Sequence, residues 1–265
     1  SFGLEVSLAT KNIEQTNFSW RTSFNVGYTY DRITRLDYGP RLVDAINANG
    51  AAVLGGPRRG LFSTDFAGLS STGIPQFYNE DGEIGIANLD LQDREGLSNK
   101  LVYEGPTEPR GGGGFTNTFT FGNLTLNVLL SYKFDYKIRL NDAFYSSYTD
   151  FDALPRDLIN RWAAPGDEEI TDIPVVLPRN LAQANFDYVL AYQFYNKSTA
   201  RVADGTYVRL RSASLSYNFP TNLISKLKLG SASISVEGQN LLLLYSDSRL
   251  NGQDPEFFSM GGVAM

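Results

Sequence analysis

The chain has 265 residues, of which 42% are hydrophobic and 13% aromatic, and its formal net charge is −6. It has no cysteine and no histidine, which excludes thiol chemistry and histidine-based sites, and its negative charge argues against nucleic acid as a partner. No run of 18 or more apolar residues occurs, which excludes a transmembrane helix but not a membrane β-barrel, whose strands show only every second residue to lipid.

Alternation of apolar and polar residues predicts long strands from the N-terminus onward, because successive side chains of a strand point to opposite faces. The first strands are expected over residues 1–12 and 18–32. On the second, Phe24, Val26 and Tyr28 form an apolar face. No signal peptide precedes this pattern, so we expect the chain to begin inside a longer protein.

Two shorter segments, residues 60–69 and 74–79, are predicted as strands as well, and residues 115–121 alternate phenylalanine with threonine. The glycine run before them, in "RGGGGF" (110–115), lacks the Gly-Lys-Ser/Thr ending of a phosphate loop. We expect it to allow a close backbone approach at the start of a strand.

The segment "LTLNVLLSYKFDYKIRL" (124–140) has the most regular alternation. Its apolar row is Leu124, Leu126, Val128, Leu130, Tyr132 and Phe134. Aliphatic residues come first and aromatic ones follow, as expected where a membrane strand meets the interface. A slip of one residue would turn Lys133 toward lipid, at a cost of about 2–4 kcal/mol at the bilayer midplane.

The last two predicted strands cover residues 206–219 and 231–245, and both change phase. In the first, Val208 and Leu210 are even-numbered while Leu215 and Tyr217 are odd-numbered, which predicts a β-bulge near residues 211–212. The charged side chains assigned to the polar, lumen-facing row are Arg21, Asp31, Lys133, Asp135, Lys137 and Arg139.

Short and long connections alternate between these roughly eight strands. The short connections are 15–17, 70–73, 122–123 and 220–231, and the long ones are 36–58, 80–111, 141–204 and 247–265. Transmembrane barrels have short turns on one side and long loops on the other. The pattern therefore favours an antiparallel transmembrane barrel, with a soluble carbohydrate-binding sandwich or a passive porin as alternatives.

Aromatic residues in the loop 141–204 are candidate contacts for substrate or for a covering partner: Tyr145, Tyr148, Phe151 and Trp162. Packing of the loop upon itself is the competing interpretation. Carboxylates in residues 79–85 and 165–169 suggest Ca²⁺ only weakly, and turns are favoured there. No catalytic arrangement is recognisable, so neither an enzyme nor a resident cofactor is expected.

Several motifs resemble the C-terminal signature of SusC/RagA-type, TonB-dependent outer-membrane transporters. The matching positions are Asp204, Gly205, Tyr207, Arg209 and Leu210, then Leu215, Tyr217 and Pro220, then Gly238 to Leu241, and finally Asp254 to Glu256. Residues 153–168 resemble the family's Arg-Trp-x-x-Pro-Gly-Asp segment. The resemblance covers nearly the whole chain, in the family's order.

This resemblance implies a barrel of about 22 strands with an N-terminal plug, driven by TonB and covered by a SusD-like surface lipoprotein. Residues 1–265 would be one partial barrel domain from its C-terminal portion, with the plug, the TonB-binding region and the last strand outside them. The implied function is import of an oligosaccharide or oligopeptide across the outer membrane of a Gram-negative bacterium of the Bacteroidota.

Overall fold

The computed structural model describes residues 1–86, 90–94, 96–144, 155–177, 179–184 and 186–258, which divide into two compact units. The sheet unit comprises Ser1–Asp31, Pro109–Tyr136 and Asp204–Pro255. The loop unit comprises Arg32–Glu108, Lys137–Ala203 and the residues from Glu256 onward. No helix among the described residues is long and apolar enough to cross a bilayer.

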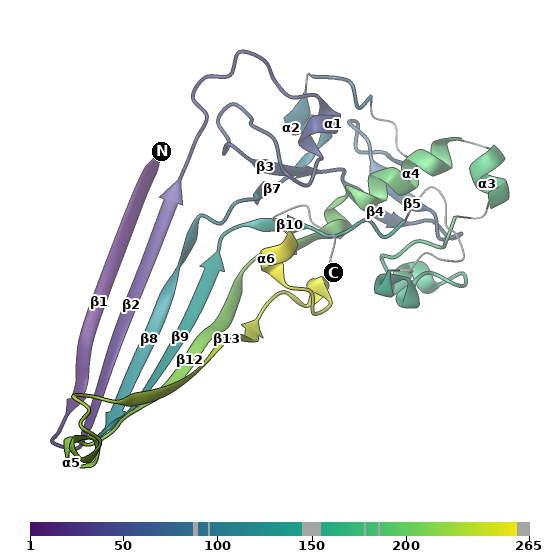
Figure 1. Cartoon of the computed structure of the whole chain (residues 1–265). Coiled ribbons are helices and arrows are strands. Elements are labelled where there is room, and N and C mark those ends of the chain that lie inside the picture. Colours follow the sequence, from purple (N-terminus) through teal and green to yellow (C-terminus); the bar gives the residue numbers. More distant parts are fainter. Residues whose placement is uncertain (87–89, 95, 145–154, 178, 185, 259–265) are drawn as a thin grey trace. The chain divides into compact units, whose positions relative to one another are not determined.

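The sheet unit is one antiparallel sheet of six long strands in the order β1-β2-β8-β9-β12-β13, so its strands lie side by side in chain order (Figure 1). The strands are β1 (Phe2–Glu14), β2 (Phe18–Tyr30), β8 (Gly111–Phe121), β9 (Leu124–Phe134), β12 (Tyr207–Asn218) and β13 (Ser233–Tyr245). At ~3.3 Å per residue they are roughly 35–45 Å long, more than a tilted membrane strand needs.

Connections at one end of this sheet are short and those at the other end are long. Residues 15–17 and 122–123 are tight turns, and 219–232 form a compact connection with helix α5 (Thr221–Ile224) and the 3-10 turn η4 (Ser225–Leu227). The long connections are 31–110 and 135–206. The predicted alternation of short and long connections is therefore confirmed for the six-stranded sheet.

The prediction of about eight strands in one wall is wrong in its count. Residues 60–69 and 74–79 do form strands, but they pair within small separate sheets of the loop unit. Consequently 36–58 and 80–111 are parts of one connection between β2 and β8. Local alternation identifies a strand, but it does not specify the sheet that the strand joins.

The loop unit consists of short elements. Its strands are β3 (Gly60–Ser63), β4 (Phe66–Leu69), β5 (Pro75–Tyr78), β6 (Ile84–Gly85), β7 (Val102–Pro106), β10 (Lys137–Arg139) and β11 (Val202–Asp204), which continues into the sheet unit. Its helices are α1 (Leu42–Ala45), α2 (Leu97–Lys100), α3 (Arg179–Ala184) and α4 (Phe186–Asn196), with 3-10 turns η1 (Arg156–Asn160), η2 (Asp167–Glu169) and η3 (Thr199–Arg201). The final helix, α6 (Pro255–Phe258), begins at the boundary between the units.

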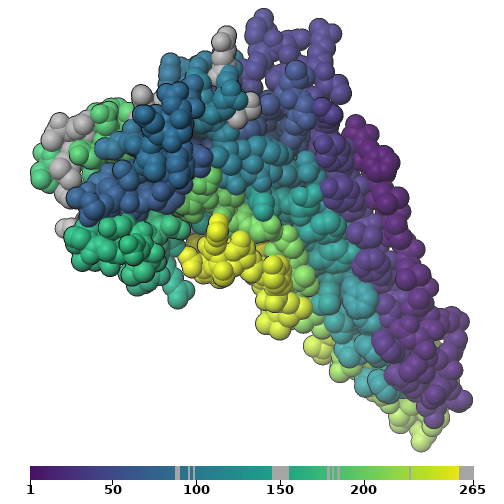
Figure 2. All heavy atoms as spheres, turned by 180° about the vertical axis from the view of Figure 1, so that it is seen from behind, coloured from purple at the N-terminus to yellow at the C-terminus, as the bar shows by residue number. Residues whose placement is uncertain are grey.

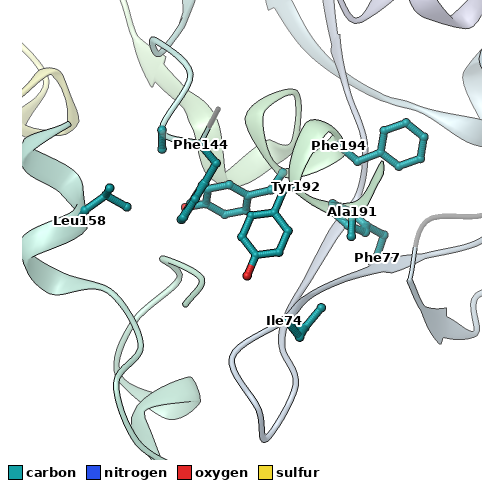
Figure 3. Close-up of a cluster of buried hydrophobic side chains, with 9 residues drawn as sticks. Ile74, Phe77, Phe144, Leu158, Ala191, Tyr192 and Phe194 are labelled. Atoms are coloured by element: carbon teal, nitrogen blue, oxygen red, sulfur yellow. The ribbon is translucent and has the colours of Figure 1, made fainter. Parts of the chain in front are cut away.

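Two buried clusters stabilise the loop unit. The first joins α4 to β5 and to the residues after β10, and in it Phe144 packs edge-on against Tyr192 at 5.0 Å (Figure 3). Its members are Ile74, Phe77, Ala143, Phe144, Leu158, Ala191, Tyr192, Phe194 and Tyr195. The second surrounds α1 and α2 and includes Leu42, Phe62 and Leu97. Burying each such aromatic or aliphatic side chain contributes about 1.5–3 kcal/mol.

Candidate functional site

The register of the sheet unit places the predicted apolar row on one face. Phe24 lies opposite Phe115, which lies opposite Leu130, while Arg21 and Thr118 pair in the alternate row. The same face carries every residue predicted to meet lipid: Phe24, Val26, Tyr28, Leu124, Leu126, Val128, Leu130, Tyr132 and Phe134. Their contact with lipid stays a prediction, because the register shows only that they share a face.

Four aromatic rings form a continuous row on this face. Tyr132 stacks with both Phe24 and Phe134, with ring centroids 6.1 and 6.3 Å apart, and Tyr28 stacks with Phe134 at 6.3 Å. The row lies over the glycine run, since a Cβ at Gly111 would meet the Phe134 ring at 2.2 Å. The predicted close approach at "RGGGGF" is therefore confirmed, and the rings cover a backbone that lacks side chains of its own.

A chain of hydrogen bonds crosses the apolar face, and sequence reasoning did not predict it. The Asn117 side-chain oxygen accepts from Trp20 Nε1 at 2.9 Å and from the Thr22 hydroxyl at 2.8 Å. Asn12 donates to the same Thr22 hydroxyl oxygen at 2.6 Å. These polar side chains therefore satisfy one another, which lowers the cost of exposing them to an apolar medium.

Charged residues after Phe134 do not continue the polar face as predicted. Asp135 has a φ of 60°, which ends β9, and its carboxylate accepts from the hydroxyl of Tyr28, a residue of the apolar face. Lys137 and Arg139 lie in β10, within a different sheet. Placing them in the lumen-facing row was therefore wrong, because the turn at Asp135 redirects the chain. Arg21 and Lys133 do lie in the polar row, and the facing of Asp31, just after β2, stays a prediction.

Arg139 is instead buried in the loop unit and 5% exposed. Its guanidinium donates to the carbonyl oxygens of Ser198 and Phe62, at 2.6 and 2.7 Å, and to Ser63 Oγ at 3.0 Å. Burial lowers the pKa of Arg139 to about 10, while the carboxylate of Glu104 opposes that change. The group therefore stays charged at neutral pH and joins three segments of the loop unit.

A second buried arginine, Arg201, lies in η3. Arg201 donates to the carboxylate of Asp157 and to the carbonyl oxygen of Asn141, each at 2.6 Å. Through these two contacts Arg201 links η1 to the segment that follows β10. In addition, burial raises the pKa of Tyr195 well above its ordinary value, so its hydroxyl is neutral at physiological pH. The charged groups at the centre of the loop unit thus act as structural ties.

Trp162 is part of a compact turn that includes η2. Its indole Nε1 donates to Glu168 Oε2 at 2.9 Å, and its ring lies so close to Gly73 that a Cβ there would meet it at 2.5 Å. Asp167 Oδ2 accepts from two backbone amides of the same turn at 2.9 Å. Tyr145, Tyr148 and Phe151 lie outside the described residues.

The loop unit contains a pocket of ≈ 1140 Å³, lined by residues 43–48 around α1 and by α3 and α4. The aromatic side chains in its wall, Phe144, Tyr192 and Phe194, are each at most 5% exposed. Exposed amides of Gln183 and Gln193 line it as well.

The pocket also contains one ion pair. Lys197 donates to Asp142 at 2.8 Å, and their side chains are 31% and 39% exposed. Asn196 is fully engaged, because its amide accepts from the backbone of Ala143 and donates to the carbonyl of Phe144. The pocket can therefore offer polar groups of both charges beside apolar side chains.

The first carboxylate segment considered for calcium, residues 79–85, folds as a turn. Asn79 Oδ1 accepts from the amides of Asp81 and Glu83, and Gly82 has a φ of 78°, which is the turn that the sequence predicted. Among the described residues, no group of three or more acidic, histidine or cysteine side chains could hold a metal ion.

Residues of the signature motifs contact other parts of the sheet unit at the start of β12 and in its bulge. Arg211 is the extra residue that the phase change predicted, and its guanidinium donates to Asn240 Oδ1 at 2.7 Å. Asn240 has a φ of 51°, which explains the phase change of β13. Gly205 lies against the Tyr136 ring, and Arg209 forms an ion pair with Asp254. The motifs are thus structural contacts.

Comparison with known proteins finds relatives along nearly the whole chain. No family model matches the chain. The TonB-dependent receptor P3 of Formosa agariphila is 26% identical over 96% of this chain and 25% of its own length, and receptor P26 of the same organism is 24% identical over 98% and 26%. The solved structure of the RagAB peptide transporter matches with a TM-score of 0.69 and 19% identity, over 96% of this chain and 26% of the matched chain.

The chain is therefore similar to TonB-dependent receptors over nearly its whole length, and its fold matches part of the RagAB structure. The chain spans about a quarter of the length of the relatives it matches. Its sheet is accordingly part of a larger barrel, and β1 and β13 each pair with only one neighbour among the described strands. In a membrane, open edges of this kind would need further strands, since unpaired backbone groups are very costly in lipid.

Proposed function

We propose that this segment forms part of the wall and loops of a transporter that imports a bulky nutrient across the outer membrane of a Gram-negative bacterium of the Bacteroidota. The observation that carries the proposal is an open apolar face on long paired strands. Leu4, Leu242 and Val236 on that face are 60%, 58% and 72% exposed. Lipid is the medium that such a face requires, and the polar row would then line the lumen.

A soluble carbohydrate-binding sandwich fits less well. That alternative needs a second sheet over the apolar face. The small sheets that the structure describes have strands of two to five residues, too short to cover strands of eleven to thirteen. A transport role is proposed in place of catalysis, in agreement with the receptor and transporter names of the relatives.

Heat-modifiable migration of the full-length protein on a gel tests the barrel. An unboiled sample should migrate differently from a boiled one, and identical migration would count against a barrel. Uptake in cells then separates active import from a passive porin. Dissipating the proton-motive force should abolish import by a TonB-dependent transporter, whereas a porin would keep passing its solute.

The pocket in the loop unit favours an oligopeptide over a glycan as the cargo. Sugar rings stack on exposed aromatic faces, but the rings of Phe144, Tyr192 and Phe194 are turned into the core. The amides of Gln183 and Gln193 both donate and accept hydrogen bonds, as a peptide backbone requires. Competition between labelled oligopeptides and oligosaccharides for uptake tests this preference, and Gln193→Ala should weaken uptake of the preferred class only.

A SusD-like surface lipoprotein is the proposed partner over the loops, and TonB would engage a region outside this chain. Exposed apolar side chains in the loop unit support a protein interface, since Ile170 is 83%, Ile159 75% and Phe186 64% exposed. Co-purification of the full-length protein with a SusD-like lipoprotein of the same organism tests this. Ile170→Asp should reduce that co-purification, and an unchanged yield would place the interface elsewhere.

A further inference from the structure

Residues 246–255, here called the strap, follow β13 and fold back onto the sheet unit. The backbone amide of Asp204 donates to Asp247 Oδ2 at 2.8 Å, which holds the first part of the strap beside the start of β12. Near its other end, Asp254 forms an ion pair with Arg209 at 2.5 Å. Leu250, between these two contacts, is 1% exposed. The strap is therefore anchored at both ends, and it lies against β12 in Figure 2 (yellow against green).

The ion pair is on the polar face of the sheet. Arg209 lies opposite Ser131, in the row that alternates with Leu130 and Tyr132. The side chain of Arg209 is only 7% exposed and that of Asp254 26%. Farther along the same face, Glu237 is exposed to solvent. The strap thus contacts the polar face near the end at which the long connections leave.

The strap has an ordered turn of its own. Asp247 Oδ1 accepts from the amide of Arg249 at 2.9 Å and caps the 3-10 turn η5 (Ser248–Leu250). Asn251 then adopts a φ of 51°, and the backbone amide of Gln253 donates to the carbonyl oxygen of Leu250 at 2.9 Å. Arg249, Asn251 and Gln253 are exposed, so the surface of the strap is polar, as the lining of a water-filled path would be.

We propose that the strap is a constriction of the transport path that limits cargo by size, with the Arg209–Asp254 ion pair as its latch. The inference rests on the proposed function, in which the polar face lines the lumen. A segment held against that face narrows the lumen, and releasing its latch widens the path.

Labelling of the full-length transporter tests the latch. A cysteine at Leu250, which is 1% exposed while the strap is held, is reacted with a membrane-impermeant maleimide in cells, with and without Asp254→Asn. Loss of a largely buried, charge-assisted contact should raise the labelling rate about tenfold or more. The charge exchange Arg209→Asp with Asp254→Arg should restore slow labelling. Asp37→Asn is the matched control, because its partner Arg35 has an 86% exposed side chain, and the labelling rate should not change.

Uptake of labelled peptide and dextrin ladders tests the constriction. Asp254→Asn should raise the uptake of long members relative to short ones, and the charge exchange should reverse that change. Labelling that does not respond to Asp254→Asn would overturn the latch, and faster labelling with an unchanged uptake ratio would overturn the constriction. If unboiled protein shows a folded barrel but no ladder is imported by any variant, the proposed function fails, and the labelling result still decides the latch.

Discussion

Replacing Arg139 by methionine tests whether a buried guanidinium holds the loop unit together. Methionine keeps the unbranched apolar stem but donates no hydrogen bond. The carbonyl oxygens of Ser198 and Phe62 and the hydroxyl of Ser63 would lose a donor that now lies 2.6–3.0 Å away. All three belong to residues that are at most 5% exposed, so water cannot readily replace the donor.

The size of the effect follows from these contacts. Each buried acceptor left without a partner costs about 1–3 kcal/mol, and the carbonyl of Ser198 contributes least because it still accepts from the amide of Arg201 at 3.0 Å. Part of this cost is offset, because a charge no longer has to be buried. The net loss should be about 3 kcal/mol in the free energy of local opening, which corresponds to roughly a hundredfold larger population of the open state.

Hydrogen exchange of the full-length transporter in detergent measures that population. The amides of Thr64 and Thr199 report it, because they bond across the same region, each at 3.1 Å, to the carbonyls of Lys197 and Thr64. Both should exchange about a hundredfold faster in the Arg139→Met variant. Arg35→Met is the control, and it should change the free energy of local opening by less than about 0.5 kcal/mol. Exchange within threefold of the wild-type rate would refute the structural role of Arg139.

Three further predictions concern the sheet and the compact turn. Gly113→Ala should prevent formation of the heat-modifiable barrel, because its Cβ would lie 2.0 Å from a carbonyl oxygen of β2, whereas Gly114→Ala, with 3.5 Å as its closest contact, should be tolerated. Asn117→Val should lower the melting temperature, because it leaves the hydroxyl of Thr22 without its acceptor, and adding Thr22→Val should recover part of the loss. The hydrogen bond from the Trp162 indole holds the pKa of Glu168 below its ordinary value of 4.5. The Glu168 carboxylate therefore stabilises the compact turn fully above pH 4.5, and this contribution is lost as the pH falls through the lower pKa of the folded state. Tryptophan fluorescence should report the resulting loosening of the turn.

Each of these expectations has an outcome that contradicts it. Equal folding of the two glycine variants would mean that the strand has room to move. Additive losses for Asn117→Val and Thr22→Val would show that the two side chains act independently. For Glu168, the comparison is with Glu168→Gln, which cannot titrate. The same fluorescence transition in both proteins would assign the pH dependence to another group.

Much of the sheet unit could be predicted from local pattern. The two faces of β2 and β9, the alternation of short and long connections and the bulge at Arg211 all follow from a side-chain period of two. The resemblance of motifs pointed to the group of proteins in which the relatives were then found. The pocket and the hydrogen bonds around Asn117 could not be predicted in this way, since each joins residues that are far apart in sequence. The aromatic residues of the loop could be named, but not their burial.

The sequence by itself determined which segments extend and which side of each strand is apolar, because backbone geometry sends neighbouring side chains to opposite faces whatever surrounds them. Only the tertiary structure decided which strands share a sheet, where the chain turns aside at Asp135, and that Arg139 enters a core while Arg209 meets Asp254. These outcomes depend on contacts between distant segments. The residue pattern within one segment carries no information about which distant segment it will contact.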